Sequence, residues 1–218
     1  DVNKGVAWLL AQQLPGGFWQ DQPDTVLRDT AAALVALKLF PDGAAGVAGG
    51  QAWLGLGVPE NSDFLARKQD GLGNTSLDEV LVLQNADGGW GSAPGFRSNP
   101  SDTALMLTTL TNGGVCPLGG SFAGAVDYLH AVQNADGGWG PYVVARSEPF
   151  DTALVLLALQ RSADAVSAAR RASIRKGREY LVATQLSDGS WPPTTRPAGA
   201  QSHAQRTSTT AWALLALV

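Results

Sequence analysis

The sequence predicts an all-α fold in which an outer ring of helices surrounds an inner ring. One seven-residue turn recurs along the 218 residues: it begins with Gln, passes through Gly and ends on Trp. Trp90 and Trp139 are 49 positions apart, and Trp139 and Trp191 are 52 apart. Repetition at this period leaves room for two helices and two connections in each repeat. We call these segments the Gln–Trp turns, and they span Gln13–Trp19, Gln84–Trp90, Gln133–Trp139 and Gln185–Trp191.

Two kinds of helix alternate around these turns. The helix before a turn is amphipathic: Tyr128 and Leu129 recur with other apolar residues at helical spacing, whereas Asp127 and His130 fall elsewhere. One apolar stripe implies one buried face, so these helices are predicted to lie on the outside. The helix after a turn is apolar on every side, as in 151–159, and must be covered on every side. The alternation therefore predicts a double ring.

About five outer–inner pairs follow, in a single domain over 1–218. The second pair is degraded, because the copy around Trp53 keeps its helix but Gly-Val-Pro replaces the turn. The predicted outer helices span 3–14, 45–56, 75–85, 122–133 and 168–185. The predicted inner helices span 25–40, 62–69, 101–112, 150–163 and 206–218.

The inner helices start with residues that suit a helix N-terminus. Pro100 and Pro149 supply rigid turns, and a carboxylate follows each of them by two positions. Free N–H groups and the helix dipole favour negative charge at this end. Carboxylates near the starts of four inner helices are Asp29, Asp63, Asp102 and Asp151.

The composition excludes several classes of protein. The formal net charge is −4 and no basic run occurs, which argues against nucleic acid and anionic membranes as partners. No apolar run reaches the roughly 18 residues of a membrane span, so no transmembrane segment is expected. Cys116 is the only cysteine, so no intrachain disulfide forms, and we expect the thiol to fill apolar space. The chain starts at Asp1, not Met, which indicates processing or excision and favours a secreted or cell-surface bacterial protein.

The repeated motifs resemble a known family. Residues 176–191 read Lys-Gly-x-x-Tyr-Leu-x-x-x-Gln-x-x-Asp-Gly-Ser-Trp and resemble a complete QW motif of squalene and oxidosqualene cyclases. Residues 4–19 give a second, nearly complete copy, and the Asp-Thr-Ala helix starts resemble those of terpenoid cyclases and protein prenyltransferase β subunits. The resemblance covers nearly the whole chain, with 41–75 the poorest stretch, and implies an α/α toroid. Family toroids commonly close with six pairs, so five pairs fit a small closed ring, an open arc or a fragment.

The resemblance also implies roles for the repeated residues. In the family, the Gln amide and the Trp ring tie one outer helix to the next turn, so we expect this of Gln13, Trp19, Gln84, Trp90, Gln133, Trp139, Gln185 and Trp191. The alternative is an aromatic box around a cation-stabilising pocket, which requires rings that face a cavity. Trp212 differs, because it lies on an inner helix and can face the axis or the outer ring.

The resemblance permits a test for cyclase chemistry. Cyclases of the squalene–hopene kind protonate an alkene with the middle Asp of Asp-x-Asp-Asp-Thr-Ala, which neighbouring groups must keep protonated. This chain keeps the final Asp-Thr-Ala at three helix starts, but other residues occupy the donor positions: Arg28, Ser101 and Phe150. No catalytic residue is assigned; if the chain is an enzyme, Asp102 and Asp151 are the best candidates and Asp29 is the third.

The chain also lacks the residues that other reactions found on this architecture require. Zinc-dependent prenyl transfer uses Asp-x-Cys and a distant His, but no Asp lies two residues before Cys116. His130 is expected on the exposed side of an outer helix and His203 in a loop. The Cys-Gly-Glu-Gln of thioester domains and an aspartate-rich pair for magnesium diphosphate are also missing. We expect no metal site and no cofactor.

The inner-helix starts of a double ring share one mouth of the barrel. The candidate rim residues of a ligand cavity are therefore Asp29, Asp63, Asp102, Asp151 and Trp212. Helix capping explains the carboxylates without any ligand. The alternative is an acidic rim that binds a cation or a polar headgroup, and Arg28 would neutralise part of it.

Three functions stay open. Intact structural motifs beside missing catalytic ones favour a non-catalytic repeat domain that binds an apolar, isoprenoid- or lipid-like molecule or a protein partner. The resemblance also allows a terpenoid cyclase or another isoprenoid-converting enzyme, which a plugged axis would argue against. A surface scaffold module is the third function, and it would show an exposed apolar patch on the outer helices.

Overall fold

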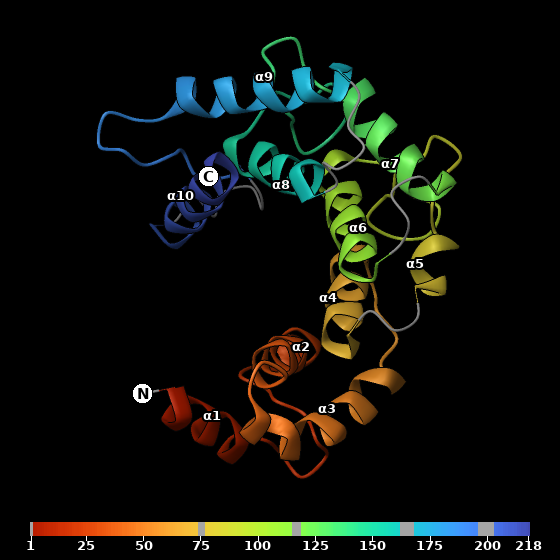
Figure 1. Cartoon of the computed structure of the whole chain (residues 1–218), viewed down its shortest axis with the longest axis vertical. Coiled ribbons are helices and arrows are strands. Elements are labelled where there is room, and N and C mark those ends of the chain that lie inside the picture. Colours follow the sequence, from red (N-terminus) through yellow and green to blue (C-terminus); the bar gives the residue numbers. More distant parts are fainter. Residues whose placement is uncertain (1, 74–76, 115–118, 162–167, 196–202) are drawn as a thin grey trace. The chain divides into compact units, whose positions relative to one another are not determined.

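The computed structural model describes residues 2–73, 77–114, 119–161, 168–195 and 203–218. All regular secondary structure in these ranges is helical, which confirms the predicted all-α class. The chain divides into two compact units, Asp1–Val82 and Leu83–Val218. Figure 1 labels the helices of both, and each unit is described by itself.

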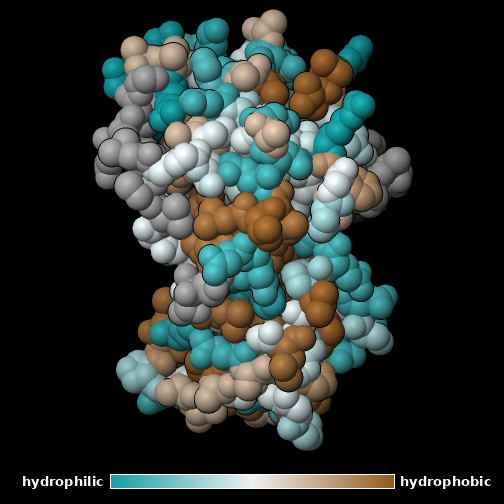
Figure 2. All heavy atoms as spheres, turned by 90° about the vertical axis from the view of Figure 1, so that its right-hand side faces the viewer, coloured by the Kyte–Doolittle hydropathy of each residue, from teal (hydrophilic) through white to brown (hydrophobic). Residues whose placement is uncertain are grey.

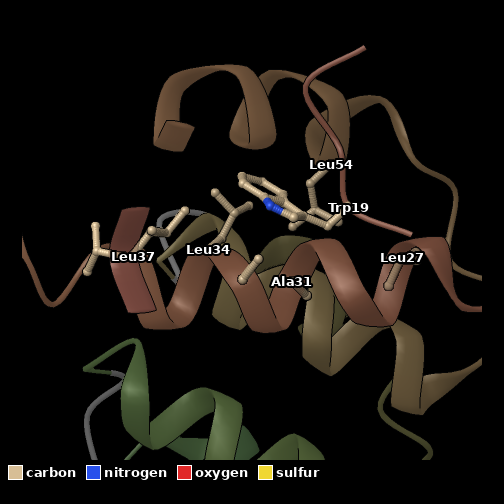
Figure 3. Packing of buried hydrophobic residues seen from close by; sticks show 8 residues of the cluster. Trp19, Leu27, Ala31, Leu34, Leu37 and Leu54 are labelled. Atoms are coloured by element: carbon tan, nitrogen blue, oxygen red, sulfur yellow. The ribbon is translucent and has the colours of Figure 1, made fainter. Parts of the chain in front are cut away.

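Helix α2 is the centre of the first unit, packed between α3 and α4. The buried Trp19 ring lies over α2, beside Leu34 and Leu54 (Figure 3). Full burial of a leucine side chain contributes about 1.5–3 kcal/mol, so this cluster is a main source of stability. The helices are α1 (Val2–Ala11), α2 (Val26–Leu37), α3 (Ala44–Leu56), α4 (Ser62–Leu72) and α5 (Asp78–Leu81), with 3-10 turns at Pro23–Thr25 and Pro41–Gly43.

Helix α8 is the centre of the second unit. It packs against α6 and α10 on its two flanks and is covered by α9, while α7 covers α6 (Figure 1). α6, α8 and α10 are thus the inner helices, and α7 and α9 the outer ones. They span α6 (Pro100–Asn112), α7 (Gly120–Ala131), α8 (Pro149–Arg161), α9 (Ala168–Thr184) and α10 (His203–Leu217).

Most predicted helix bounds lie within a few residues of the observed ones, but two in the first unit need correction. Of the outer helix predicted over 75–85, residues 75 and 76 lie outside the described residues. From residue 77 on only α5 is helical, since the chain already turns at Val82 before the Gln–Trp turn. The inner helix predicted over 62–69 continues to Leu72. It ends there because Gly73, with a φ of 87°, adopts the left-handed conformation that closes a helix.

Two further expectations concern single residues of the second unit. His203, expected in a loop, is the first residue of α10, because Ala, Gln and Arg directly after it are good helix formers. Cys116 lies outside the described residues. His130 is exposed as predicted, and its Nδ1 is 2.5 Å from Oγ of Ser173 on α9.

The outer helices of the second unit bury one face, as predicted. On α9 the buried residues Ser173, Gly177 and Leu181 are spaced by four. On the face shown in Figure 2, hydrophilic and neutral residues lie beside patches of hydrophobic ones.

The expectation that every inner helix is covered all round is wrong for α2 and α10. α6 and α8 are almost fully covered, but Val35 of α2 is 44% exposed and Leu214 of α10 is 52% exposed. Leu214 is exposed because α8 and α9 pack against only part of the circumference of α10.

Helix α4 also departs from an apolar inner helix. Lys68 is only 5% exposed, and its ammonium donates to both carboxylate oxygens of Glu79, at 3.1 and 3.0 Å. The ion pair compensates part of the desolvation of the buried charge.

Candidate functional site

The Gln side chains of the Gln–Trp turns link successive elements. Each amide donates to the carbonyl of a positive-φ glycine in its own turn, at 2.7–2.8 Å. In three turns the amide also donates to a carbonyl at the start of the next outer helix. These bonds join Gln13 to Gly46 (2.9 Å), Gln84 to Ser121 (2.7 Å) and Gln133 to Ser173 (2.9 Å). A neutral amide with two N–H donors thus binds a turn and a following helix together.

The Trp rings of these turns are buried in the protein. Exposure is 4% for Trp19, 0% for Trp90 and Trp139, and 1% for Trp191. The indole N–H of Trp19, Trp139 and Trp191 donates to a leucine carbonyl of the preceding helix at 2.7 Å. Rings buried to this degree anchor the turn and do not form an exposed aromatic box.

A threonine on four of the five inner helices, α2, α6, α8 and α10, makes a further link that we did not predict from the sequence. The Oγ1 atoms of Thr30, Thr103, Thr152 and Thr210 accept a hydrogen bond from the backbone N–H of the Trp, at 2.9–3.1 Å. The first three hydroxyls also donate to the carbonyl of that Trp. The available signal was the Thr of Asp-Thr-Ala, 11 to 13 residues after Trp19, Trp90 and Trp139. Thr210 differs, because it lies in Thr-Thr-Ala, 19 residues after Trp191.

Three of the four Gln–Trp turns contain an acidic residue that holds the turn closed, and Gln13–Trp19 has none. Asp87 and Asp136 each accept from a backbone N–H two residues later at 3.0 Å and from a serine hydroxyl at 2.7 Å. The hydroxyl and backbone N–H of Ser190 hold the pKa of Asp188 below its ordinary value, and Arg206 adds to this effect.

The two rim candidates of the first unit are bound to groups of their own helices and turns. Burial acts to raise the pKa of Asp29. The hydroxyl of Thr25, the Asp21 amide and Arg28 outweigh it, so the pKa is lowered. Asp63 pairs with Arg67 one turn later at 2.7 Å, and Asn61 caps α4. A lowered pKa makes Asp29 ionised at neutral pH and unsuited to donate a proton.

The two rim candidates of the second unit lie at adjoining helix starts. The Ser101 hydroxyl donates to Oδ1 of Asp151, which is only 4% exposed. Asp102 accepts from Asn99 at 2.5 Å and Ser92 at 2.8 Å. The cap of α6 is Asn99, so Asp102 lies in the first turn and does not cap the helix itself.

Tyr180 of α9 approaches this region from the outer layer. Its hydroxyl donates to the carbonyl of Ser147 at 2.7 Å. Burial, together with the negative charges of Asp136, Glu148 and Asp151, raises the pKa of Tyr180 to about 12. The phenol therefore stays a neutral hydrogen-bond donor at physiological pH.

One stripe on each inner helix of the second unit is turned away from the buried contacts. Its residues lie two before, two after and five after the threonine that binds Trp, and they are half-buried or exposed. We call this set the inner stripe, and it consists of Ser101, Leu105, Thr108, Phe150, Leu154, Leu157, Ser208, Trp212 and Leu215. Hydroxyls and Phe150 mark the helix starts, and the later positions of α8 and α10 are apolar. Trp212 of α10 thus occupies the position that Leu154 occupies in α8, two residues after the threonine that binds Trp.

The described ranges hold neither a cluster of metal-binding side chains nor a helix that could span a membrane. No group of three His, Cys, Asp or Glu side chains gathers there in a way that could hold a metal ion. None of the helices there combines the length and the apolar character needed to cross a membrane.

Sequence comparison finds no matching family profile and no matching curated relative. Solved structures match in fold. The ent-copalyl diphosphate synthase from Streptomyces platensis has a TM-score of 0.68 at 18% identity, over 97% of this chain and 45% of that one. A protein from Actinoplanes gives 0.67 at 19% identity, over 99% and 82%. A variant of the type II terpene cyclase MstE from Scytonema, in complex with its substrate geranylgeranyl dihydroxybenzoate, gives 0.63 at 16% identity, over 99% and 70%.

The chain has the α/α-toroid fold of the terpene cyclases. It spans less than half the length of the Streptomyces enzyme. The Ser101 hydroxyl, at one of the three positions that the sequence analysis compared with a cyclase proton donor, donates to Asp151.

Proposed function

We propose that this chain is a terpene-cyclase-like repeat domain that binds an apolar, isoprenoid-like molecule along the inner stripe without converting it. The inner stripe is the observation that supports the proposal. Trp212 and Leu215 are 38% and 58% exposed, and Leu154 and Leu157 on α8 are half-buried. Covering apolar surface contributes about 25 cal/mol per Å², so an extended hydrocarbon has a favourable place to lie. MstE, similar in fold, has a geranylgeranyl-bearing substrate.

The helix starts support binding without conversion. Protonation of an alkene needs a strong, protonated acid, and an alcohol such as Ser101 is far weaker than a carboxylic acid. Phe150 and Arg28 occupy the corresponding positions of α8 and α2. The polar end of an amphiphilic ligand would meet hydroxyls at this end of the stripe.

The second candidate function is a cyclase or another isoprenoid-converting activity. The burial of Asp151 favours it, because a carboxyl shielded from water and hydrogen-bonded by Ser101 resembles a catalytic acid more than a surface carboxylate does. Asp102 is the next candidate and Asp29 the third.

Native mass spectrometry with geranylgeraniol, geranylgeranyl diphosphate and squalene tests both functions, when it is followed by extraction and product analysis. The proposal expects a bound, unchanged ligand. A converted product that disappears in Asp151→Asn would establish the second function. Absence of binding to all three compounds would refute both.

A matched pair of variants tests the location. Leu215→Glu places a charge on the inner stripe, and Val182→Glu places one on α9, where the native side chain is similarly exposed at 63%. We expect at least a tenfold loss of affinity for the first variant and no change for the second. Equal affinities would show that the ligand binds elsewhere.

A further inference from the structure

Two loops of the second unit are built in the same way. We call them the first loop (91–98) and the second loop (140–147), and each follows the Trp of a Gln–Trp turn. An asparagine of the turn closes each loop by donating to a loop carbonyl, Asn85 to Phe96 at 3.0 Å and Asn134 to Ala145 at 2.8 Å. Equivalent positions of the two loops are 49 residues apart, like the two Trp residues before them. Loops held in this way present their side chains from a fixed backbone.

One position of the second loop has a strained backbone. Val144 has a φ of 66° and is 94% exposed. Gly95, at the equivalent position of the first loop, has a φ of 81°. Glycine adopts this left-handed conformation freely, whereas a β-branched residue adopts it only under strain. Strain of this kind concentrates at ligand-binding segments, and Val144 directly follows Tyr142 and Val143, which line a groove.

This groove is formed by both loops and the Gln84–Trp90 turn, so it lies within the second unit. Its volume of about 800 Å³ lies in the range of small-ligand sites. Phe96 of the first loop and Tyr142 of the second line it, and they are 62% and 59% exposed. The equivalent positions of the opposite loops are Ala145 and Ala93. Each loop therefore contributes one aromatic ring, from a different position.

The groove also has polar groups of both charges. Within the described residues, both hydrogen bonds to Asp87 end on Oδ1, from the Gly89 N–H at 3.0 Å and the Ser98 hydroxyl at 2.7 Å, which leaves Oδ2 to accept from a ligand. The exposed guanidinium of Arg97 adds hydrogen-bond donors.

These groups select among ligand classes. An anion would be repelled by Asp87 and a cation by Arg97. A hydrocarbon would remove both charges from water without replacing their hydrogen bonds. A neutral sugar suits the groove better, because its hydroxyls both donate and accept, while its C–H faces can cover aromatic rings.

We propose that this groove binds a neutral oligosaccharide. The rings of Phe96 and Tyr142 lie against the C–H faces of the sugar, and sugar hydroxyls donate to Oδ2 of Asp87 and accept from Arg97. Because the two rings come from two loops, the ligand is at least a disaccharide. The groove shares no residue with the inner stripe, so this site is independent of the proposed isoprenoid site.

Isothermal titration calorimetry with maltohexaose, cellohexaose and chitohexaose tests the proposal, with polygalacturonate as an acidic comparison. At least one neutral sugar should bind, and more tightly than polygalacturonate. Phe96→Ala and Tyr142→Ala should each weaken its binding about tenfold. Phe96→Tyr keeps a ring and should retain the affinity. Since both native side chains are more than half exposed, none of these changes should lower Tm appreciably.

Two control variants complete the experiment. Val182→Ala shortens a side chain of α9 that is 63% exposed and lies outside the groove, and Leu215→Glu charges the inner stripe. Both should bind the sugar like the parent chain. The proposal would be overturned if none of the three neutral sugars bound at millimolar concentration, if polygalacturonate bound more tightly than all of them, or if Phe96→Ala and Tyr142→Ala left the affinity unchanged.

Discussion

Replacing Thr152 by Val tests the link between an inner helix and its Gln–Trp turn. The change removes the hydroxyl but keeps the branched shape. The Trp139 N–H loses its acceptor, at 2.9 Å, while the Trp139 carbonyl keeps the Glu148 N–H, also at 2.9 Å. One buried N–H without an acceptor costs about 1–3 kcal/mol. At about 2–4 °C per kcal/mol for a chain of this size, Tm should fall by roughly 2–12 °C.

Urea unfolding followed by tryptophan fluorescence measures this loss. Thr108→Val is the control, since its hydroxyl donates only to a carbonyl of its own helix, Ala104, at 2.9 Å. We expect the control to stay within about 0.5 kcal/mol of the parent chain. Equal free energies of unfolding for the two variants would refute a specific role for Thr152.

Three other predictions concern the turns, the buried ion pair and a tyrosine. In urea titrations, Gly137→Ala should lower the free energy of unfolding by roughly 2–4 kcal/mol, because its φ is 88° and a Cβ would lie 2.6 Å from a carbonyl oxygen of α9. Gly55→Ala, in open space, should instead raise it by about 0.5–1 kcal/mol. In thermal denaturation, Glu79→Gln should destabilise more than Lys68→Met, because only the first leaves a buried ammonium without its carboxylate; the reverse order would contradict this. Tyrosine ionises at a pH of about 10 in the unfolded chain, and the pKa of Tyr180 in the folded chain is about 12. Between these two pH values, the folded state retains a proton that the unfolded state has lost. Stability should therefore fall as pH rises through this window, and Tyr180→Phe should make the fall shallower; an unchanged slope would argue against a raised pKa.

The sequence predicted the helices well, because their pattern is local. One-sided and all-round apolar patterns separated outer α7 and α9 from inner α6 and α8 before any packing was known. The exposed flank of α10 could not be predicted in this way, since residues 210–217 of α10 are similar in sequence to residues 152–159 of α8 and the two helices differ in their neighbours.

The candidate site was harder to predict than the helices. The Asp-Thr-Ala starts drew attention to the carboxylates, whereas the threonine proved to be the residue that binds Trp. The bond between Ser101 and Asp151 joins residues 50 positions apart. It depends on how the starts of α6 and α8 align, which helical periodicity within either segment does not specify.

The Gln–Trp turns have a consequence for cooperativity. Each turn bonds to the helices next to it in the chain, so the stability of such an array is approximately a sum over neighbouring pairs. α8 has packed neighbours on both flanks and outside, whereas one flank of α10 is open. Amide protons of α8 should therefore exchange with solvent more slowly than those of α10. In an array of this kind, adding or deleting a terminal repeat changes a single boundary, so repeat number can vary between related proteins while the interior stays intact.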